Sequence, residues 1–178
     1  MLIRPRRGQV GRAGPDDSLV ELVMACHARI RRFTAMAVTL AAPATQGRPA
    51  AEIADGADAV RRYLAVALPL HVADEDASIT PRLRGRAPEV DAALARMHAE
   101  HEGHAPLLEA VIELCAAIAR APGDQAALAP ARAPAAGALE AALLAHLEEE
   151  ERVILPAIAA LPAAEQAAIV AELRARRA

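Results

Sequence analysis

The sequence predicts an all-α protein: an antiparallel four-helix up-down bundle with a short extra C-terminal helix. Helix-favouring Ala, Leu, Arg and Glu dominate the 178 residues, and aromatic residues make up only 1% of them. Apolar residues recur at helical spacing along several long segments, which are separated by stretches containing proline or glycine. Helices joined by short connections pack as antiparallel neighbours, so a bundle is expected.

The first two helices are expected in the first half of the chain. The first should span about residues 18–42, with Asp17 or Ser18 as its N-cap. The second should span about residues 49–84 after a connection rich in proline and glycine. Pro69 removes a backbone hydrogen bond inside this second helix, so a kink or a break is expected there.

The third helix is expected over about residues 88–121, where a proline and a glutamate open it. Gly103 and Pro106 are expected to interrupt its middle. Residues 122–133 begin with a proline and a glycine, contain a second proline, and are interpreted as a loop.

The fourth helix is expected over about residues 134–160, and a short amphipathic fifth helix over 162–177 should serve as a lid or a packing arm. The chain therefore divides into three parts. A mobile basic tail would occupy residues 1–16, the bundle residues 17–161, and the C-terminal helix residues 162–178.

Charge and composition exclude several classes of protein. The net charge is −3, although the first residues are basic, and aromatic side chains for stacking on bases are scarce, so no nucleic-acid partner is expected. No apolar run approaches the roughly 20 residues that cross a bilayer, so no membrane association is expected. The N-terminus lacks the apolar core of a secretory signal, and only two cysteines occur, Cys26 and Cys115. We therefore expect a cytoplasmic protein.

An internal repeat carries the candidate chemistry. The pattern His-x3-Glu-x3-Ile-x-Pro occurs twice, 75 residues apart, and two further histidines are 74 residues apart in the preceding helices. Each half of the chain thus consists of a helix with a central histidine, followed by a helix with a His-x3-Glu pair. The residues concerned are His27, His71, Glu75, Ile79 and Pro81 in the first half, and His101, His146, Glu150, Ile154 and Pro156 in the second.

The two carboxylates of the repeat interrupt apolar helix faces. Residues four apart lie on one face of a helix, so each glutamate shares an inward face with its histidine. Burying unpaired like charges costs several kcal/mol, and metal cations would remove that cost. Two bridging carboxylates and two histidines per ion would leave one or two open positions on each metal. Iron fits this ligand set, with manganese or zinc possible. The candidate metal ligands are His27, His71, Glu75, His101, His146 and Glu150.

Other polar residues near the motifs have plainer interpretations. His98 and His104 flank His101 at spacings of three, so at most one of them could reach the site, and surface or supporting roles are favoured. Tyr63, about two turns before His71, is expected to pack in the core rather than to bind metal.

The thiols and the remaining acids also have simple roles. Cys26 and Cys115 are expected to be free, with redox sensing by Cys26 as the alternative. Glu100 either accepts a hydrogen bond from a ligand histidine or is exposed. A solvated acidic rim is expected from Asp74, Asp76, Glu148, Glu149 and Glu151.

These motifs, spread over about residues 18–160, resemble those of hemerythrin-like proteins with the HHE cation-binding domain. The matching positions are His27, His71-VAD-Glu75 with Pro81, Glu100-His101, and His146-LEE-Glu150 with Pro156. The resemblance implies a hemerythrin-like bundle that holds a non-haem di-iron centre, oxo- or hydroxo-bridged. In that centre the four histidines would be terminal ligands and the two glutamates would be bridges.

The expected function is metal binding with a small ligand. We expect a di-iron protein that binds, senses or scavenges O₂, NO, peroxide or iron, with a part in a stress response. Two alternatives remain: a di-iron peroxidase, oxidase or NO-detoxifying enzyme, and a metal-stabilised interaction module. No nucleophile–base motif or phosphate-binding glycine loop occurs, so no catalytic residue is assigned and enzymatic activity is left open. The protein is expected to be a monomer or a homodimer.

Overall fold

The computed structural model describes residues 18–42 and 48–178, and every regular element in these residues is a helix. The elements are α1 (Leu19–Ala41), α2 (Ala50–Arg62), a π-helical segment (Tyr63–Ala67), α3 (Leu68–Asp74), a second π segment (Glu75–Ile79), α4 (Thr80–Leu83), α5 (Pro88–Arg120), a 3₁₀ turn (Pro122–Asp124), α6 (Gln125–Glu149), a third π segment (Glu150–Ile154), α7 (Leu155–Ala159) and α8 (Ala163–Ala175).

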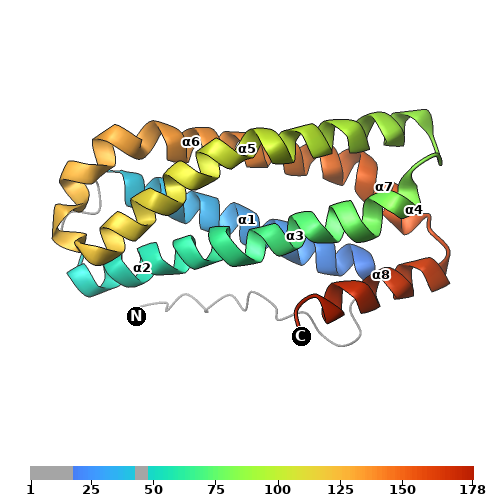
Figure 1. The fold of residues 1–178 in the computed structure, drawn as a ribbon, viewed down its shortest axis with the longest axis horizontal. Helices are drawn as coiled ribbons and strands as arrows, with labels where there is room; N and C mark the ends of the chain where they lie inside the picture. Colours follow the sequence, from blue (N-terminus) through green and yellow to red (C-terminus); the bar gives the residue numbers. More distant parts are fainter. Residues whose placement is uncertain (1–17, 43–47) are drawn as a thin grey trace, which may run out of the picture.

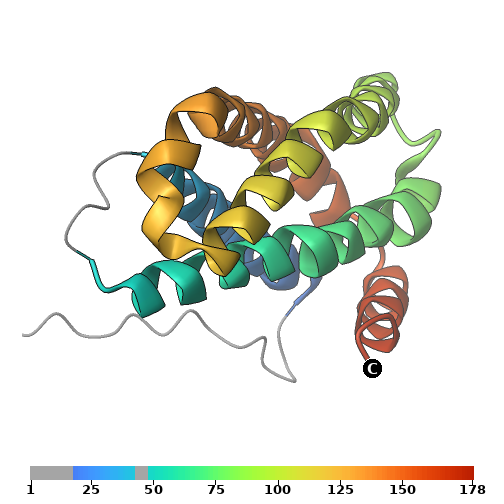
Figure 2. The same cartoon turned by 60° about the vertical axis from the view of Figure 1, so that its left-hand side comes forward.

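The helices form the antiparallel bundle that the sequence predicts. Successive rods, namely α1, the run α2–α4, α5 and the run α6–α7, travel in alternating directions, and α8 packs outside them (Figure 1). The turned view of Figure 2 shows the same rods surrounding one interior. The basic tail expected at residues 1–16 lies outside the described residues. Among the described helices, none is both long enough and apolar enough to cross a membrane.

The start of α1 confirms Ser18 as its N-cap. The Ser18 hydroxyl accepts a hydrogen bond from the backbone N–H of Glu21, and the Glu21 carboxylate accepts one from the backbone N–H of Ser18 at 2.8 Å. This reciprocal capping box satisfies two donors that would otherwise lack partners at the helix end.

The second helical rod continues past Pro69 instead of breaking there. A π-helical segment ends two residues before Pro69, and the same holds for Pro81 and Pro156. In a regular α-helix a proline lacks an N–H and its ring clashes with the carbonyl four residues earlier. A wider turn immediately ahead of the proline relieves that clash and lets the rod continue.

The prediction that Gly103 and Pro106 interrupt the third helix is wrong. Helix α5 runs unbroken from Pro88 to Arg120, through Gly103 and Pro106. Both of these residues are exposed, so the proline ring faces solvent and water can satisfy the carbonyl that it leaves free.

The prediction of a loop at residues 122–133 is also wrong, because α6 already begins at Gln125. The Gln125 side chain is buried, and its amide nitrogen donates to the carbonyls of Leu40 at 2.7 Å and Ala42 at 2.9 Å. These carbonyls belong to the end of α1, where helical partners run out. A contact between distant parts of the chain therefore holds the first turn of α6 in place.

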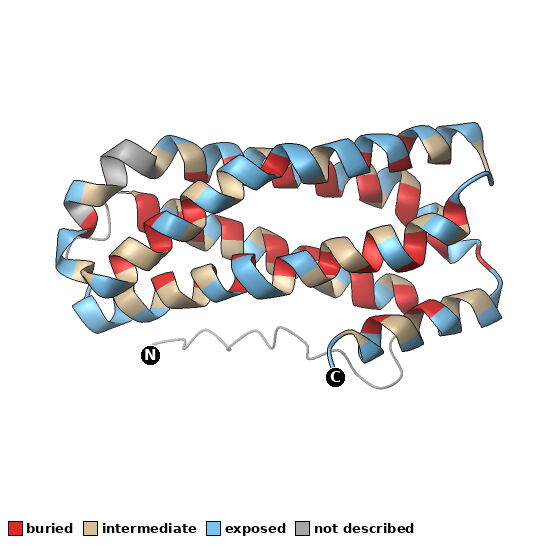
Figure 3. Ribbon diagram, in the orientation of Figure 1, coloured by how far each residue is buried: buried red, intermediate tan, exposed pale blue. Residues whose placement is uncertain are grey.

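The core consists of two apolar clusters with a polar layer between them. One cluster gathers around Ile30, Leu64 and Leu143, and the other around Val23 and Ile154. Along each rod the buried residues lie on the inward face (Figure 3). The candidate ligands occupy the layer where one cluster gives way to the other, and this places them far from either end of the bundle.

Helix α8 is a packing arm rather than a free segment. Its Ile169 and Leu173 are buried in the second apolar cluster. Two ion pairs fasten it to the end of the second rod, Arg82–Glu172 at 2.6 Å and Arg86–Glu165 at 2.7 Å.

Candidate metal centre

The structure brings all six sequence-predicted ligands together in the polar layer. They come from every rod of the bundle, and five of them are buried while His101 is nearly so. Glu75 and Glu150 are each the first residue of a π segment, a wider turn that is frequent at functional sites. The contributing side chains are His27 of α1, His71 of α3, Glu75, His101 of α5, His146 of α6 and Glu150.

The six residues form two groups of four that share both carboxylates. His27 and His71 belong to one group, and His101 and His146 to the other. Within each group one donor atom from every residue lies within 4.8 Å of the others, a spacing that could hold a metal ion. The layer therefore contains two adjacent candidate cation sites.

Each shared carboxylate divides its two oxygens between the groups. For Glu75, Oε1 lies 2.9 Å from Nε2 of His71, and Oε2 lies 3.2 Å from Nε2 of His101. Glu150 behaves alike, because its Oε2 lies 3.1 Å from Nε2 of His27 and its Oε1 lies 3.2 Å from Nε2 of His146. This is the arrangement of a carboxylate that bridges two ions.

The facing atoms are close but are not hydrogen-bonded. The Nε2 atoms of His27, His71 and His101, Oε2 of Glu75 and both oxygens of Glu150 are buried without a hydrogen-bond partner among the described residues. Each such group costs about 1–3 kcal/mol when left unsatisfied. Donor atoms bound at about 2.1 Å and right angles to one cation lie about 3.0 Å apart, close to the separations found here. These separations are therefore compatible with cations held between the facing atoms.

Carboxylates hold the opposite nitrogens of two of the histidines. Nδ1 of His27 lies 2.9 Å from Oε1 of Glu151, which also accepts a hydrogen bond from Arg31 at 2.8 Å. Nδ1 of His146 lies 2.7 Å from Oε2 of Glu100. An imidazole that donates through Nδ1 presents the lone pair of Nε2 to a metal.

The prediction of a solvated acidic rim is only partly correct. Glu148 is exposed, but Glu151 is half-buried against His27, and Glu149 pairs with Arg96 and Arg152. Asp74 is buried and pairs with two arginines from the end of the chain. The Glu149–Arg152 pair joins residues three apart on one rod, but the other contacts join distant parts of the chain, so sequence spacing gave no signal for them.

His98 and His104, the two histidines that flank His101 in the sequence, lie in different surroundings. His98 is exposed, and its ring nitrogen lies 3.9 Å from Asp76, whose carboxylate is 3.6 Å from Nδ1 of His101. His104 is buried, with its ring edge against the ring of His146 at 5.5 Å between centroids.

The structure also places Tyr63 and the two cysteines. Tyr63 packs on Phe33, as expected, with ring centroids 4.1 Å apart. Cys26 and Cys115 are free thiols, and Cys26 lies beside His71.

Electrostatics within the layer favour charged pairs when no cation is bound. Burial alone would lower the pKa of His71, but the carboxylates of Glu75 and Glu150 raise it well above its ordinary value. Burial would lower the pKa of His146 as well, yet Glu150 and Glu100 raise it to about 9. Burial would raise the pKa of Glu75, but His71 and His101 hold it well below its ordinary value. A metal ion therefore has to displace protons from these imidazoles.

A small cavity of about 20 Å³ borders the layer on the side of the first apolar cluster. Three candidate ligands and His104 contribute to its wall, and the rest is aliphatic. One water molecule needs roughly 10–15 Å³ of such space, so the cavity has room for one very small molecule.

An antiparallel helical bundle with four imidazoles and two shared carboxylates in its interior defines a class, the helical-bundle cation-binding proteins. The family model of the hemerythrin HHE cation binding domain matches residues 18–175, and the chain belongs to this family. None of the curated proteins compared with the chain matches it.

Proposed function

We propose that this protein binds two iron ions in the six-residue layer. His27 and His71 would hold one ion, His101 and His146 the other, and the two glutamates would bridge them. The observation that carries the proposal is the division of each carboxylate between the two pairs of imidazoles, at 2.9–3.2 Å.

The donor set supports iron over other cations. Imidazole nitrogen with carboxylate oxygen suits iron, while manganese or zinc would accept the same ligands with less preference. Buried polar atoms without partners supply the driving force, because any of these cations would satisfy them together.

We further propose that the centre binds, senses or scavenges O₂, NO or peroxide, or buffers iron itself, in the cytoplasm. Two bound iron ions would supply redox chemistry and open coordination positions for such a ligand. The chain's own residues support this role in two ways. Glu151 and Glu100 orient His27 and His146, and the two apolar clusters keep bulk water from the layer. The cavity of about 20 Å³ beside three of the histidines has room for one very small molecule.

Metal analysis of the purified protein tests the proposal. We expect two iron ions per chain after growth in iron-replete medium, and ligand-dependent changes in the near-ultraviolet and visible spectrum on exposure to O₂ or azide. His101→Ala should lower the iron content to one ion or less. The matched control is His98→Ala, which removes an exposed histidine from the same helix and should keep both ions. Wild-type protein that holds no metal would overturn the proposal.

A further inference from the structure

A larger pocket lies next to the metal-binding layer but outside it. It occupies about 780 Å³ between α1, the second rod and α8, within the range of 300–1,000 Å³ typical of small-molecule sites. Most of its wall is aliphatic, from residues such as Leu22, Leu70 and Leu173. His71 also lines it, so its contents would lie beside the candidate metal centre.

Tyr63 contributes an unused hydroxyl to this pocket. Its side chain is only 9% exposed, and the hydroxyl has no hydrogen-bond partner among residues 18–42 and 48–178. Cys26, Arg29 and Arg177 act electrostatically on this hydroxyl, and all three line the same pocket as Tyr63. Burial raises the pKa of Tyr63, which keeps it a neutral donor. The hydroxyl is not among the fully buried atoms without partners, so it reaches the open space of the pocket, where a ligand could accept its hydrogen bond.

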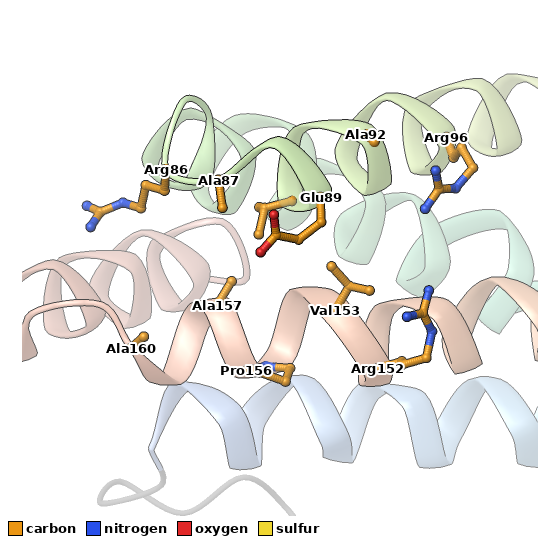
Figure 4. A pocket seen from close by; sticks show the side chains of 11 residues that line it. Arg86, Ala87, Glu89, Ala92, Arg96, Arg152, Val153, Pro156, Ala157 and Ala160 are labelled. Atoms are coloured by element: carbon orange, nitrogen blue, oxygen red, sulfur yellow. The ribbon is translucent and has the colours of Figure 1, made fainter.

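Arg29 contributes a positive charge that meets a thiol rather than a carboxylate. Its Nη2 lies 3.1 Å from the sulfur of Cys26, and no carboxylate in the described part of the chain pairs with it. The hollow between α5 and α7, of about 600 Å³, shows the contrast (Figure 4). There Arg96 and Arg152 pair with Glu149, and Arg86 is bound to a glutamate of α8.

The edge of the pocket formed by α8 is also positive. Arg177 lines it and shares the buried carboxylate of Asp74 with Arg176. Two guanidinium groups face this one carboxylate, so the edge keeps a net positive charge. Together with Arg29, it surrounds a mainly apolar space with cationic groups.

We propose that this pocket binds an amphipathic anion, a small carboxylate with an aliphatic chain. The chain would lie on the leucines, and the carboxylate would accept hydrogen bonds from Arg29 and the Tyr63 hydroxyl. Bonds to a charged acceptor are the strong ones, and a guanidinium matches the planar carboxylate. The inference goes beyond the metal-binding function and does not depend on it.

Calorimetric titration of the full-length protein with decanoate tests the proposal. We expect saturable binding of one molecule per chain. Tyr63 is the only tyrosine and the chain has no tryptophan, so the intrinsic emission of Tyr63 should change in parallel. Arg29→Gln should weaken binding roughly tenfold or more, because it removes a charge-assisted bond. The control Arg120→Gln removes a charge from the exposed end of α5 and should bind as the wild type does.

Three results would overturn the proposal. The first is the absence of saturable binding at decanoate concentrations up to about 1 mM, because a Kd above that concentration means that the pocket binds decanoate only weakly. The second is equal binding by folded Arg29→Gln and wild-type protein, which would indicate coordination at the metals or adsorption elsewhere. The third is equally tight binding of decanol, which has the same chain without the charge. The first and third results do not depend on how much iron the protein holds.

Discussion

Neighbouring residues of this chain show two ways of burying a carboxylate. Asp74 and Glu75 are adjacent, and each is about 2% exposed. Asp74 is paired with Arg176 and Arg177, so the protein itself supplies the countercharge. Glu75 faces His71 and His101 instead, and its Oε2 has no hydrogen-bond partner among the described residues.

Asp74 is thus a structural carboxylate, whereas Glu75 is a candidate metal ligand. Burial alone marks neither, since both residues are equally hidden. What distinguishes Glu75 is that its facing groups are imidazoles that can become neutral and share a cation with it, whereas guanidinium groups stay charged and cannot bind metal. Unsatisfied buried atoms therefore mark the candidate metal-binding carboxylates, and the pairing of Asp74 with Arg176 and Arg177 anchors the end of the chain.

Substitution of a bridging glutamate should have the largest effect. Glu150→Gln removes a charged oxygen from both groups at once, so we expect the metal content to fall from two ions to less than one per chain, as measured by elemental analysis. Glu148→Gln, an exposed residue in the preceding turn, is the matched control and should keep both ions. Two ions retained by Glu150→Gln would show that this carboxylate is not a bridge.

Loss of a carboxylate that orients a histidine should be milder. Glu100→Ala frees Nδ1 of His146, and supporting groups of this kind are worth about 10–100-fold in metal affinity. Because the Glu100 side chain is 42% exposed, we expect the lower figure, about tenfold, in competition with a chelator. Glu102→Ala, an exposed neighbour on α5, should not change the affinity. Equal affinities for the two variants would contradict the role of Glu100.

Substitution of the structural carboxylate should affect stability without affecting the metal. Asp74→Asn leaves two arginines without their countercharge, and we expect the free energy of unfolding to fall by about 2 kcal/mol in urea denaturation. The figure lies below that of a fully buried pair because both arginines are partly exposed. Glu172→Gln, at the more exposed pair with Arg82, should cost less than about 1 kcal/mol. Metal loss by Asp74→Asn with unchanged stability would reverse the distinction between the two carboxylates.

A change of pH should act on the metal-free protein alone. The pKa of His146 is raised to about 9, so its protonated form stabilises the fold fully below its ordinary pKa of 6.5. That stabilisation is lost as the pH rises from 6.5 towards 9, and His71 acts in the same direction. In metal-loaded protein these imidazoles carry no exchangeable charge, so the gap in Tm between loaded and metal-free protein should widen over this interval. A constant gap would show that the imidazoles are not charged in the metal-free layer.

Much of the fold and most of the candidate centre could be predicted from local rules. The antiparallel bundle, the Ser18 cap and the common face of each His-x3-Glu pair depend on helix geometry within a few residues. The failures were also local in origin. Pro106 is tolerated in α5 because it is exposed to water, whereas tertiary contacts of Gln125 hold a helix within residues 122–133, where helix propensity is a weak guide.

The sequence by itself determined which residues share a helix face, because the helical repeat is a property of the backbone and needs no distant partner. Only the tertiary structure decided what those faces meet. It gave Glu75 two imidazoles and Asp74 two arginines, joined the first turn of α6 to the end of α1, and placed Arg29 and Tyr63 around one apolar pocket. The physical reason is that such partners lie tens of residues apart in the chain, and packing of the helices, not their periodicity, brings them together.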